Sequence, residues 1–317
     1  MVEIRPWKPG DEDAILALFQ DVFGQAMSPE YWRWRFEHHP DGGPLIMLAW
    51  DGERLAGHYA VSRAPLMVGG RIQRAALSMT TMTHSDYRGQ DLFSRMATAL
   101  YDELAAQGFV AVLGFPNRMS HVPFRQKLDW IDIEEISTMV LRGDRLRRKP
   151  TVDPDVDEIG SIDERVGALA RDVASEAGFA GARDTRILRW RVDENPVNEY
   201  RRFVLGGGDR AAADAEAYAI TKPYGEAGLD LVEFGARDET AAKRMVDHVA
   251  ALAFEEGIAQ INCWCVPGAP HRLVLERAGF AADAPVTYFG GRAFHPLDDD
   301  FGDARRWRVS MLDSDLY

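Results

Sequence analysis

The chain repeats its own pattern about half its length apart. Arg-Trp-Arg occurs at 33–35 and again at 189–191, each time followed five residues later by proline. The segment SRMATALYDELAAQGF at 94–109 is similar to KRMVDHVAALAFEEGI at 243–258, and an apolar, strand-like run follows each. The two offsets are 156 and 149 residues. A period this long predicts two duplicated domains rather than a solenoid of short repeats.

Length and punctuation place the boundary between these domains. The 317 residues exceed one typical domain, and the 46% apolar fraction suffices for two cores. Residues 143–162 combine charge and proline without periodicity, and the basic run 145–149 within them is typical of a solvated linker. We therefore expect one domain at 1–145 and a second at 160–317.

The charge balance excludes several classes of partner. With 37 basic and 50 acidic side chains, the net charge is −13. Such a surface repels nucleic acid and anionic membranes, and no stretch reaches the length of a membrane span. The N-terminus does not resemble a targeting peptide. Cys263 and Cys265 share one face of a predicted strand, which favours reduced core thiols in a cytoplasmic protein.

The periodicity of the first half predicts a mixed α/β sheet. A strand near the N-terminus precedes a helix over 11–23 and a short helix over 28–36. Three apolar or alternating runs then fill 45–84, broken by Asp-Gly and Gly-Gly pairs that are typical of hairpins. An amphipathic helix over 90–107 follows.

The stretch HSDYRGQDLF at 84–93 joins the last of these runs to that helix. Free backbone amides at a helix N-terminus favour an anion such as a pyrophosphate. Gly89 permits close approach and Arg88 adds positive charge. An ordinary strand-to-helix turn explains these residues equally well.

The same stretch, in this order of elements, resembles the pyrophosphate turn of the GNAT superfamily of acyl-CoA-dependent N-acyltransferases. Arg88 and Gly89 match the family signature, whereas Asp91 and Phe93 replace its two later small residues. The resemblance covers about residues 2–140. The second half keeps Arg237 but has no glycine in its turn, so it resembles a degenerate copy.

The resemblance implies acetyl-CoA, or another acyl-CoA, as co-substrate bound by the first half only. The implied binding residues are Thr81, Met82, Thr83, Arg88, Gly89, Gln90, Asp91, Leu92, Phe93, Asn117 and Phe124. Trp32 to Pro40 and Trp307 to Asp315 further resemble a bacterial tandem group that includes acyltransferases acting on nucleotide-linked amino sugars.

The family reaction is direct attack by an amine, with main-chain amides near Thr81 to Thr83 polarising the thioester. Arg125 stands where the family usually has a tyrosine that serves as the general acid, so Arg125 either stabilises negative charge or forms a surface ion pair. His58 is the candidate base, with a structural hydrogen bond as its alternative. His84 is a weaker candidate for the base.

Three further residues are candidates for the acceptor site. Trp32 and Arg33 lie in the segment that roofs the acceptor pocket in this family, and His121 either meets the acceptor or caps a helix. Nothing completes a metal site around His38 and His39.

The sequence thus predicts an acyltransferase for a small-molecule amine, whose second domain shapes the cleft or mediates homodimer formation. The main alternative is a non-catalytic ligand-binding or assembly protein, in which Asp91 occupies the anion-binding amides. Aminoacyl-tRNA-dependent transfer is disfavoured by the acidic surface.

Overall fold

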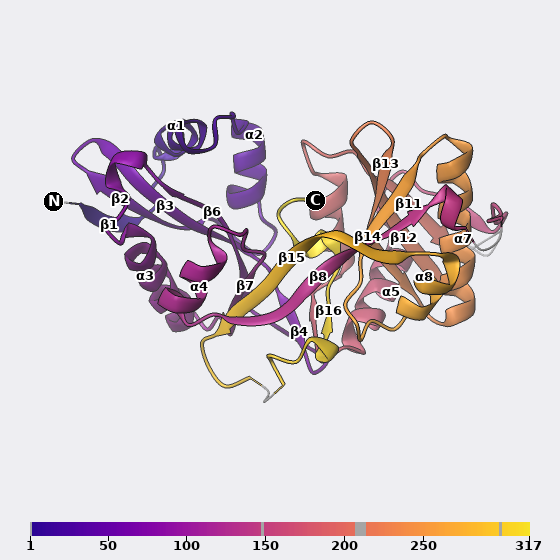
Figure 1. Cartoon of the computed structure of the whole chain (residues 1–317). Coiled ribbons are helices and arrows are strands. Elements are labelled where there is room, and N and C mark those ends of the chain that lie inside the picture. Colours follow the sequence, from indigo (N-terminus) through magenta and orange to yellow (C-terminus); the bar gives the residue numbers. More distant parts are fainter. Residues whose placement is uncertain (1, 147–148, 207–213, 298–299) are drawn as a thin grey trace. The chain divides into compact units, whose positions relative to one another are not determined.

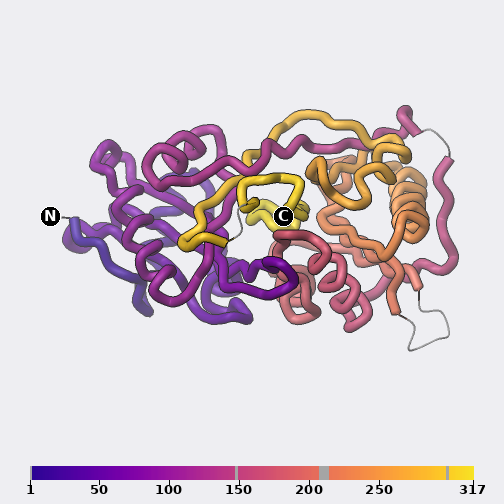
Figure 2. Tube along the Cα trace, turned by 90° about the horizontal axis from the view of Figure 1, so that it is seen from below, coloured from indigo at the N-terminus to yellow at the C-terminus, as the bar shows by residue number. Residues whose placement is uncertain are grey.

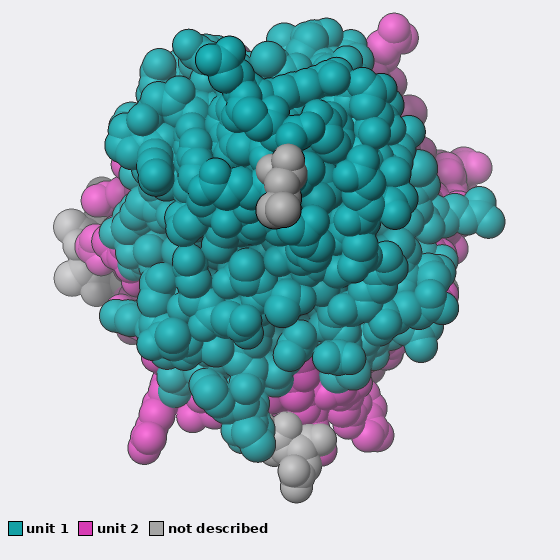
Figure 3. Space-filling model, turned by 90° about the vertical axis from the view of Figure 1, so that its left-hand side faces the viewer, with its two compact units in different colours: residues 1–65, 73–133, 288–299 teal, residues 66–72, 134–287, 300–317 magenta. Residues whose placement is uncertain are grey.

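The computed structural model describes residues 2–146, 149–206, 214–297 and 300–317. Two compact units are formed, and each contains more than one stretch of chain (Figure 3). Unit 1 comprises Met1–Pro65, Gln73–Ile133 and Tyr288–Asp299. Unit 2 comprises Leu66–Ile72, Glu134–Thr287 and Asp300–Tyr317. The predicted domains at 1–145 and 160–317 stay a prediction, and residues 147–148 of the predicted linker lie outside the described residues.

Unit 1 is built on a mixed sheet with the strand order β1-β2-β3-β6-β7-β15. Neighbouring strands are antiparallel except β6 and β7, which are parallel. The strands are β1 (Glu3–Pro6), β2 (Leu45–Asp51), β3 (Arg54–Arg63), β6 (Ala75–Thr83), β7 (Ala111–Gly114) and β15 (Ala281–Ala293), of which the last begins in unit 2. The fold class predicted from the sequence, α/β with a mixed sheet, is confirmed.

Helices cover both faces of this sheet (Figure 1). One face packs against α1 (Glu12–Phe23) and α2 (Pro29–Trp32), and the other against α3 (Leu92–Ala106) and α4 (His121–Leu128). Strand alternation explains the two cores, because Tyr59 belongs to the α3 side whereas Ala60 belongs to the α1 side.

The chain leaves unit 1 along β8 (Ile131–Arg142) and returns along β15, a course that can be followed in Figure 2. In unit 1, β15 pairs with β7, with Gly290 opposite Gly114. In unit 2, β8 pairs with β14 (Gln260–Trp264), with Met139 opposite Cys263. β8 therefore begins in unit 1 and ends in unit 2, whereas β15 begins in unit 2 and ends in unit 1.

Unit 2 has the strand order β8-β14-β13-β12-β11-β9. These strands include β9 (Val156–Glu158), β11 (Arg201–Leu205), β12 (Ala217–Tyr224) and β13 (Gly228–Ala236). A four-stranded sheet adds β4 (Leu66–Val68), β5 (Arg71–Gln73), β10 (Phe179–Gly181) and β16 (Trp307–Arg308). The helices are α5 (Glu164–Ser175), α6 (Thr185–Leu188), α7 (Glu239–Glu255) and α8 (Arg272–Ala278).

The repeated sequences take up repeated structures. The similar segments at 94–109 and 243–258 form most of α3 and part of α7. Each Arg-Trp-Arg lies in a π-helical turn, Arg33–Glu37 after α2 and Arg189–Asp193 after α6. The tryptophan and second arginine are buried in both copies. π-Helical turns are rare, and here two occur at the two copies of the same sequence motif.

The three runs predicted over 45–84 form five strands. The Gly69-Gly70 pair does turn the chain, but it joins the short strands β4 and β5, which follow β3 and precede β6 in the sequence. Periodicity could not predict this excursion because three-residue strands are too short to show a period.

Candidate functional site

The turn before α3 is open and exposed. Arg88, Gly89 and Gln90 are all exposed, and Gly89 has φ 79°, a left-handed conformation that favours glycine. Leu92 and Phe93, by contrast, pack against the protein. Leu92 is buried in the core, and Phe93 packs edge-on against Phe124 with the ring centroids 5.2 Å apart. The exposed part of the turn is thus available to a ligand, and its apolar part holds α3 to the sheet.

Asp91 does not close this turn. It is the N-terminal cap residue of α3 by position, but its side chain makes no capping hydrogen bond to the helix backbone. Instead Oδ1 accepts a hydrogen bond from Ser94 Oγ at 2.9 Å and lies 2.5 Å from Lys127 Nζ. These two hydrogen bonds lower the pKa of the Asp91 carboxyl. The first-turn amides of α3 are therefore not capped by a side chain.

The equivalent turn of unit 2 is closed. Asp238 caps α7, and its Oδ1 accepts from the backbone N–H of Ala241 at 2.9 Å. Arg237, the counterpart of Arg88, donates its Nε–H to the carbonyl of Ala215 at 2.9 Å. Each aspartate directly precedes its helix, but the two leave the helix N-termini in different states.

The parallel strands β6 and β7 diverge beside this turn. Their pairing runs from Ala75 opposite Ala111 to Leu77 opposite Leu113, and the remaining described residues of β6 have no partner in β7. The rest of β6 contains Thr81 and Thr83, which are partly exposed, and Met82, which is buried. Divergence leaves main-chain groups of β6 free to contact a ligand.

A buried polar chain braces the point of divergence. Trp130 Nε1 donates to Tyr101 Oη at 2.9 Å, Tyr101 Oη lies 2.7 Å from Tyr59 Oη, and Tyr59 Oη lies 2.8 Å from Ser78 Oγ. Burial raises the pKa of both tyrosines, so the hydroxyls stay protonated. Ser78 follows the last paired residue of β6, so this network fixes the start of the gap.

His58 lies on β3 and is fully buried. Its Nδ1 is 2.7 Å from the carbonyl oxygen of Thr80, so Nδ1 carries the proton and donates it. Nε2 is buried and has no hydrogen-bond partner among the described residues. Burial lowers the pKa of the imidazole to about 4, against the smaller opposing effect of the Thr80 hydrogen bond. His58 is therefore neutral at physiological pH.

Arg125 and His121 share one carboxylate. Arg125 Nη1 lies 3.1 Å from Asp132 Oδ2, and His121 Nε2 lies 2.7 Å from Asp132 Oδ1. The imidazole also stacks on Tyr288, with the ring centroids 4.0 Å apart. Asp132 therefore brings these two predicted site residues together at α4.

The remaining predicted residues have local structural contacts. Asn117 Oδ1 accepts from the backbone N–H groups of Met119 and Ser120, so it shapes the loop before α4. Trp32 is only 1% exposed and packs against Trp7 and Phe36. Phe124 is buried, whereas Arg33 is exposed.

Other candidates of the sequence analysis are also engaged. His84 Nδ1 accepts from Asp86 N at 3.1 Å, and His39 Nδ1 accepts from Asp41 N at 3.1 Å. Cys263 and Cys265 are free and buried, and burial raises the pKa of both thiols. Over the residues that the structure describes, no group of His, Cys, Asp or Glu side chains could hold a metal ion.

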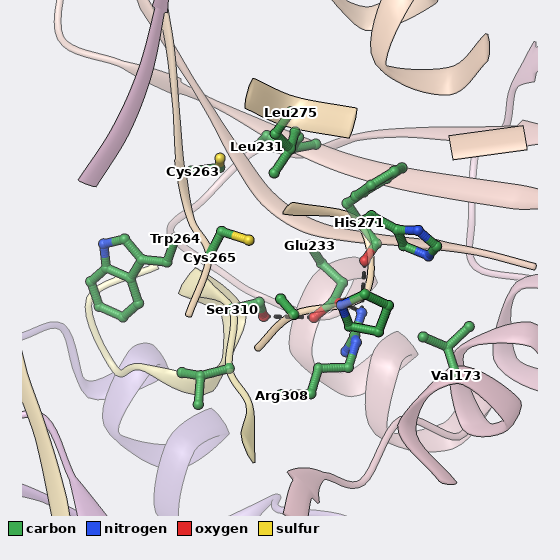
Figure 4. A pocket seen from close by; sticks show the side chains of 14 residues that line it. Val173, Leu231, Glu233, Cys263, Trp264, Cys265, His271, Leu275, Arg308 and Ser310 are labelled. Atoms are coloured by element: carbon green, nitrogen blue, oxygen red, sulfur yellow. Dashed lines mark hydrogen bonds and ion pairs between the residues drawn. The ribbon is translucent and has the colours of Figure 1, made fainter. Parts of the chain in front are cut away.

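Unit 2 has a small cavity at its own divergent strands (Figure 4). Its volume is about 50 Å³, room for a few water molecules. Cys263, Cys265 and His271 line it beside Glu233, which accepts hydrogen bonds from Arg308 and from Ser310 Oγ at 2.6 Å. Further donors to Glu233 are Arg183 Nε at 2.9 Å and Tyr218 Oη at 3.0 Å.

This buried cluster explains the sequence motif near the C-terminus. Arg183 also donates to Asp313 at 2.7 Å, so Glu233 and Asp313 share its guanidinium. Burial would raise the pKa of Glu233, but Arg308 and Arg183 outweigh it and hold that pKa at about 2. Within unit 2, the hydrogen bonds of Ser310 to Glu233 and of Arg183 to both Glu233 and Asp313 hold the segment after β16 against β13.

Sequence reasoning missed two residues of the unit 1 site, Thr80 and Lys127. Thr80 has φ 51°, and Lys127 pairs with Asp91 from 36 positions farther along the chain. Neither residue stands at a defining position of a motif, so the sequence carried no signal for them.

Comparison with known proteins relates part of the chain to one domain family. Residues 3–131 match the model of the acetyltransferase (GNAT) domain family. No curated protein matches the chain. Within the part of the chain that the structure describes, no helix is long and apolar enough to cross a membrane.

Several solved structures share the fold over 92% of this chain at 11–16% sequence identity. A protein of unknown function from Enterococcus faecalis, described as a probable N-acyltransferase, has a TM-score of 0.71 and is 14% identical, with 73% of its own chain covered. A GCN5-related N-acetyltransferase from Anabaena variabilis has a TM-score of 0.73 at 11% identity, with 72% covered. One from Kribbella flavida has a TM-score of 0.69 at 16% identity, with 71% covered. At these identities the solved structures show a shared fold. The domain match over residues 3–131 is the finding that supports acyl transfer as the general class of activity.

Proposed function

We propose that the chain is an N-acyltransferase, which moves an acyl group, most simply acetyl, from coenzyme A to a primary amine. The observation that carries this proposal is the open N-terminus of α3. Its first-turn amides lack a side-chain cap, and Arg88 and Gly89 stand exposed beside them. Backbone amides and a nearby guanidinium form an anion site that suits the pyrophosphate of coenzyme A.

The divergent strands supply the second half of the proposed site. With the pyrophosphate held at α3, the thioester would lie between β6 and β7, where β6 has lost its pairing. A main-chain N–H of β6 then polarises the thioester carbonyl, and stabilises the oxyanion formed on attack. This arrangement needs no covalent intermediate on the protein.

Chemically, the amine nitrogen attacks the thioester carbon, a C–N bond forms, and the C–S bond breaks. The nitrogen loses a proton, for which water is the proposed acceptor, because His58 is fully buried and its Nδ1–H already donates to Thr80. Coenzyme A leaves as a thiolate, and the exposed guanidinium of Arg125 is the proposed stabiliser of that charge.

A nucleotide-linked amino sugar is the proposed acceptor, on the strength of the sequence resemblance at 32–40 and 307–315. Exposed Arg33 is the candidate to contact its phosphates, because Trp32 is committed to the core. We propose unit 2 as a non-catalytic partner, since Asp238 closes the turn that would hold its pyrophosphate. A cytoplasmic location and a homodimer remain parts of this proposal.

Titration calorimetry with acetyl-CoA and free coenzyme A tests the proposal. We expect binding by the wild-type protein and at least a tenfold loss in Arg88→Glu, since a charge reversal beside a phosphate costs more than an exposed ion pair is worth. Arg171→Glu makes the same charge change on an exposed position of α5 and should leave affinity unchanged.

Turnover is then measured as thiol release across a panel of amines, including amino sugars linked to nucleotides. Wild-type protein that binds neither cofactor at millimolar concentration would refute the proposal and favour a non-catalytic role. Binding without turnover on any amine would refute the acceptor class.

A further inference from the structure

β6 contains a bulge at its point of divergence from β7. Across the sheet, Ala60 of β3 stands opposite Met79 of β6, and His58 stands opposite Met82. Tyr59 of β3 therefore faces two residues of β6, Thr80 and Thr81. Thr80 has φ 51°, a conformation that is rare for a β-branched residue. Strain of this kind persists only where the surroundings hold it, and it gathers at ligand sites.

His58 makes a hydrogen bond to the bulge. Its Nδ1–H donates to the carbonyl oxygen of Thr80 over 2.7 Å, and the ring has no exposure to solvent. A buried hydrogen bond without competing water fixes the direction of the group it binds.

Peptide geometry transmits this direction to the next residue. The carbonyl of Thr80 and the N–H of Thr81 belong to one planar trans peptide, so they point in opposite directions. An imidazole that fixes the carbonyl therefore also fixes the N–H of Thr81, which points away from His58. This N–H lies on the part of β6 that has no partner in β7.

Unit 2 provides an internal comparison. Its strand β13 is also bulged, since Ile220 of β12 faces Glu233 while Thr221 faces Leu231. Ile220, which faces Glu233 beside this bulge, has no side-chain donor. Positive φ among the described non-glycine residues occurs at Thr80, Asp91 and Asp129, and so not in β13. The histidine and the strained threonine occur together in unit 1, where the turn before the helix is open.

We propose that His58 is a positioning residue for acyl transfer, which holds the bulge of β6 so that the N–H of Thr81 faces the thioester carbonyl. This role rests on the function proposed above. It differs from a general base, which would use Nε2 rather than Nδ1.

Two amide variants separate these roles. Asparagine places an N–H group close to the position of Nδ1, whereas glutamine places one close to that of Nε2. We expect His58→Ala and His58→Gln to lower kcat about tenfold to a hundredfold, somewhat less than removal of an oxyanion donor, with the KM for acetyl-CoA within about threefold of wild type. His58→Asn should recover kcat to within about threefold, with an unchanged pH profile. A His58→Asn variant as slow as His58→Ala would overturn the proposal.

A binding measurement gives a readout that does not depend on the acceptor. S-ethyl-coenzyme A is a thioether that lacks the carbonyl of acetyl-CoA. Wild type and His58→Asn should bind acetyl-CoA more tightly than this thioether, and His58→Ala should bind the two equally. A preference retained by His58→Ala would overturn the positioning role alone, whereas a wild type that binds neither ligand would refute the proposed function.

Thr80→Gly controls for the fold, because glycine adopts positive φ without strain and keeps the carbonyl that His58 binds. We expect the variant to preserve the preference for acetyl-CoA over the thioether, because the hydrogen bond from His58 to the carbonyl of residue 80 remains. Loss of that preference in a folded Thr80→Gly protein would contradict the proposed anchoring of the bulge.

Discussion

Lys127 Nζ lies 2.5 Å from Asp91 Oδ1, and this ion pair draws the Asp91 carboxylate away from the amides of α3. The pair is exposed, with about half of each side chain accessible, so its own contribution to stability is small. The pair matters because it fixes the position of the Asp91 carboxylate. An acidic residue that could have blocked an anion site is instead tied to the next helix.

Replacement of Asp91 by glycine should tighten the binding of coenzyme A by about twofold to fivefold at low salt, because a like charge leaves the site. Glycine also suits φ 57°, so the turn keeps its shape. Calorimetric titration measures the affinity, and Asp91→Asn separates charge from backbone conformation. Weaker binding by both variants would mean that Asp91 orients Lys127 toward the ligand.

The turn before α7 in unit 2 differs from the turn before α3, because the side chain of Asp238 caps the helix. Asp238→Ala removes the cap of α7 and should destabilise that helix by about 1 kcal/mol. Faster hydrogen exchange of the α7 amides would report this loss. The variant should gain no affinity for coenzyme A, since the turn lacks glycine, and new binding in calorimetry would contradict that expectation.

Acid should weaken unit 2 through Glu233. Because the folded pKa is about 2 and the ordinary value is 4.5, its stabilising effect is complete above pH 4.5 and is lost as the pH falls toward 2. Glu233→Gln should destabilise the protein by about 3–5 kcal/mol at neutral pH, since Arg183 and Arg308 lose a shared carboxylate. Hydrogen exchange of β13 at several pH values measures both effects. An unchanged acid response in the variant would show that other groups govern it.

His58 should make unit 1 sensitive to pH in a higher range. Its folded pKa is about 4 and its ordinary value is 6.5, so the unfolded chain binds the extra proton first. The stability that depends on the neutral ring is complete above pH 6.5 and falls as the pH drops toward 4. His58→Asn, which cannot titrate, should lose this component in denaturant unfolding monitored across that range. A slope equal to that of wild type would assign the effect to another group.

The buried hydroxyl of Tyr101 should contribute to the free energy of unfolding, because it bonds both Trp130 and Tyr59. Tyr101→Phe leaves the Nε1–H of Trp130 without its acceptor and removes one of the two hydrogen bonds of the Tyr59 hydroxyl, so we expect a loss of about 1–3 kcal/mol. Phe294, which only packs against Tyr101, offers a control: Phe294→Leu should cost less. Unfolding in urea compares the two, and equal losses would contradict the network.

The sequence by itself determined the features that local rules govern. The amphipathic helices that became α3 and α7, the alternation that separates the two cores, and the glycine turn at Gly89 all depend on residues close together in the chain. Such patterns are readable because helix and strand periodicity act over a few residues.

Only the tertiary structure decided the state of the turn before α3. The motif HSDYRGQDLF placed Asp91 at the head of a helix, but its direction was set by Lys127, 36 residues away. Likewise His58 bonds Thr80 across 22 residues, and β8 and β15 each pass between the two units. These choices depend on which distant side chains and strands meet when the sheet forms, and a one-dimensional pattern carries no information about that meeting.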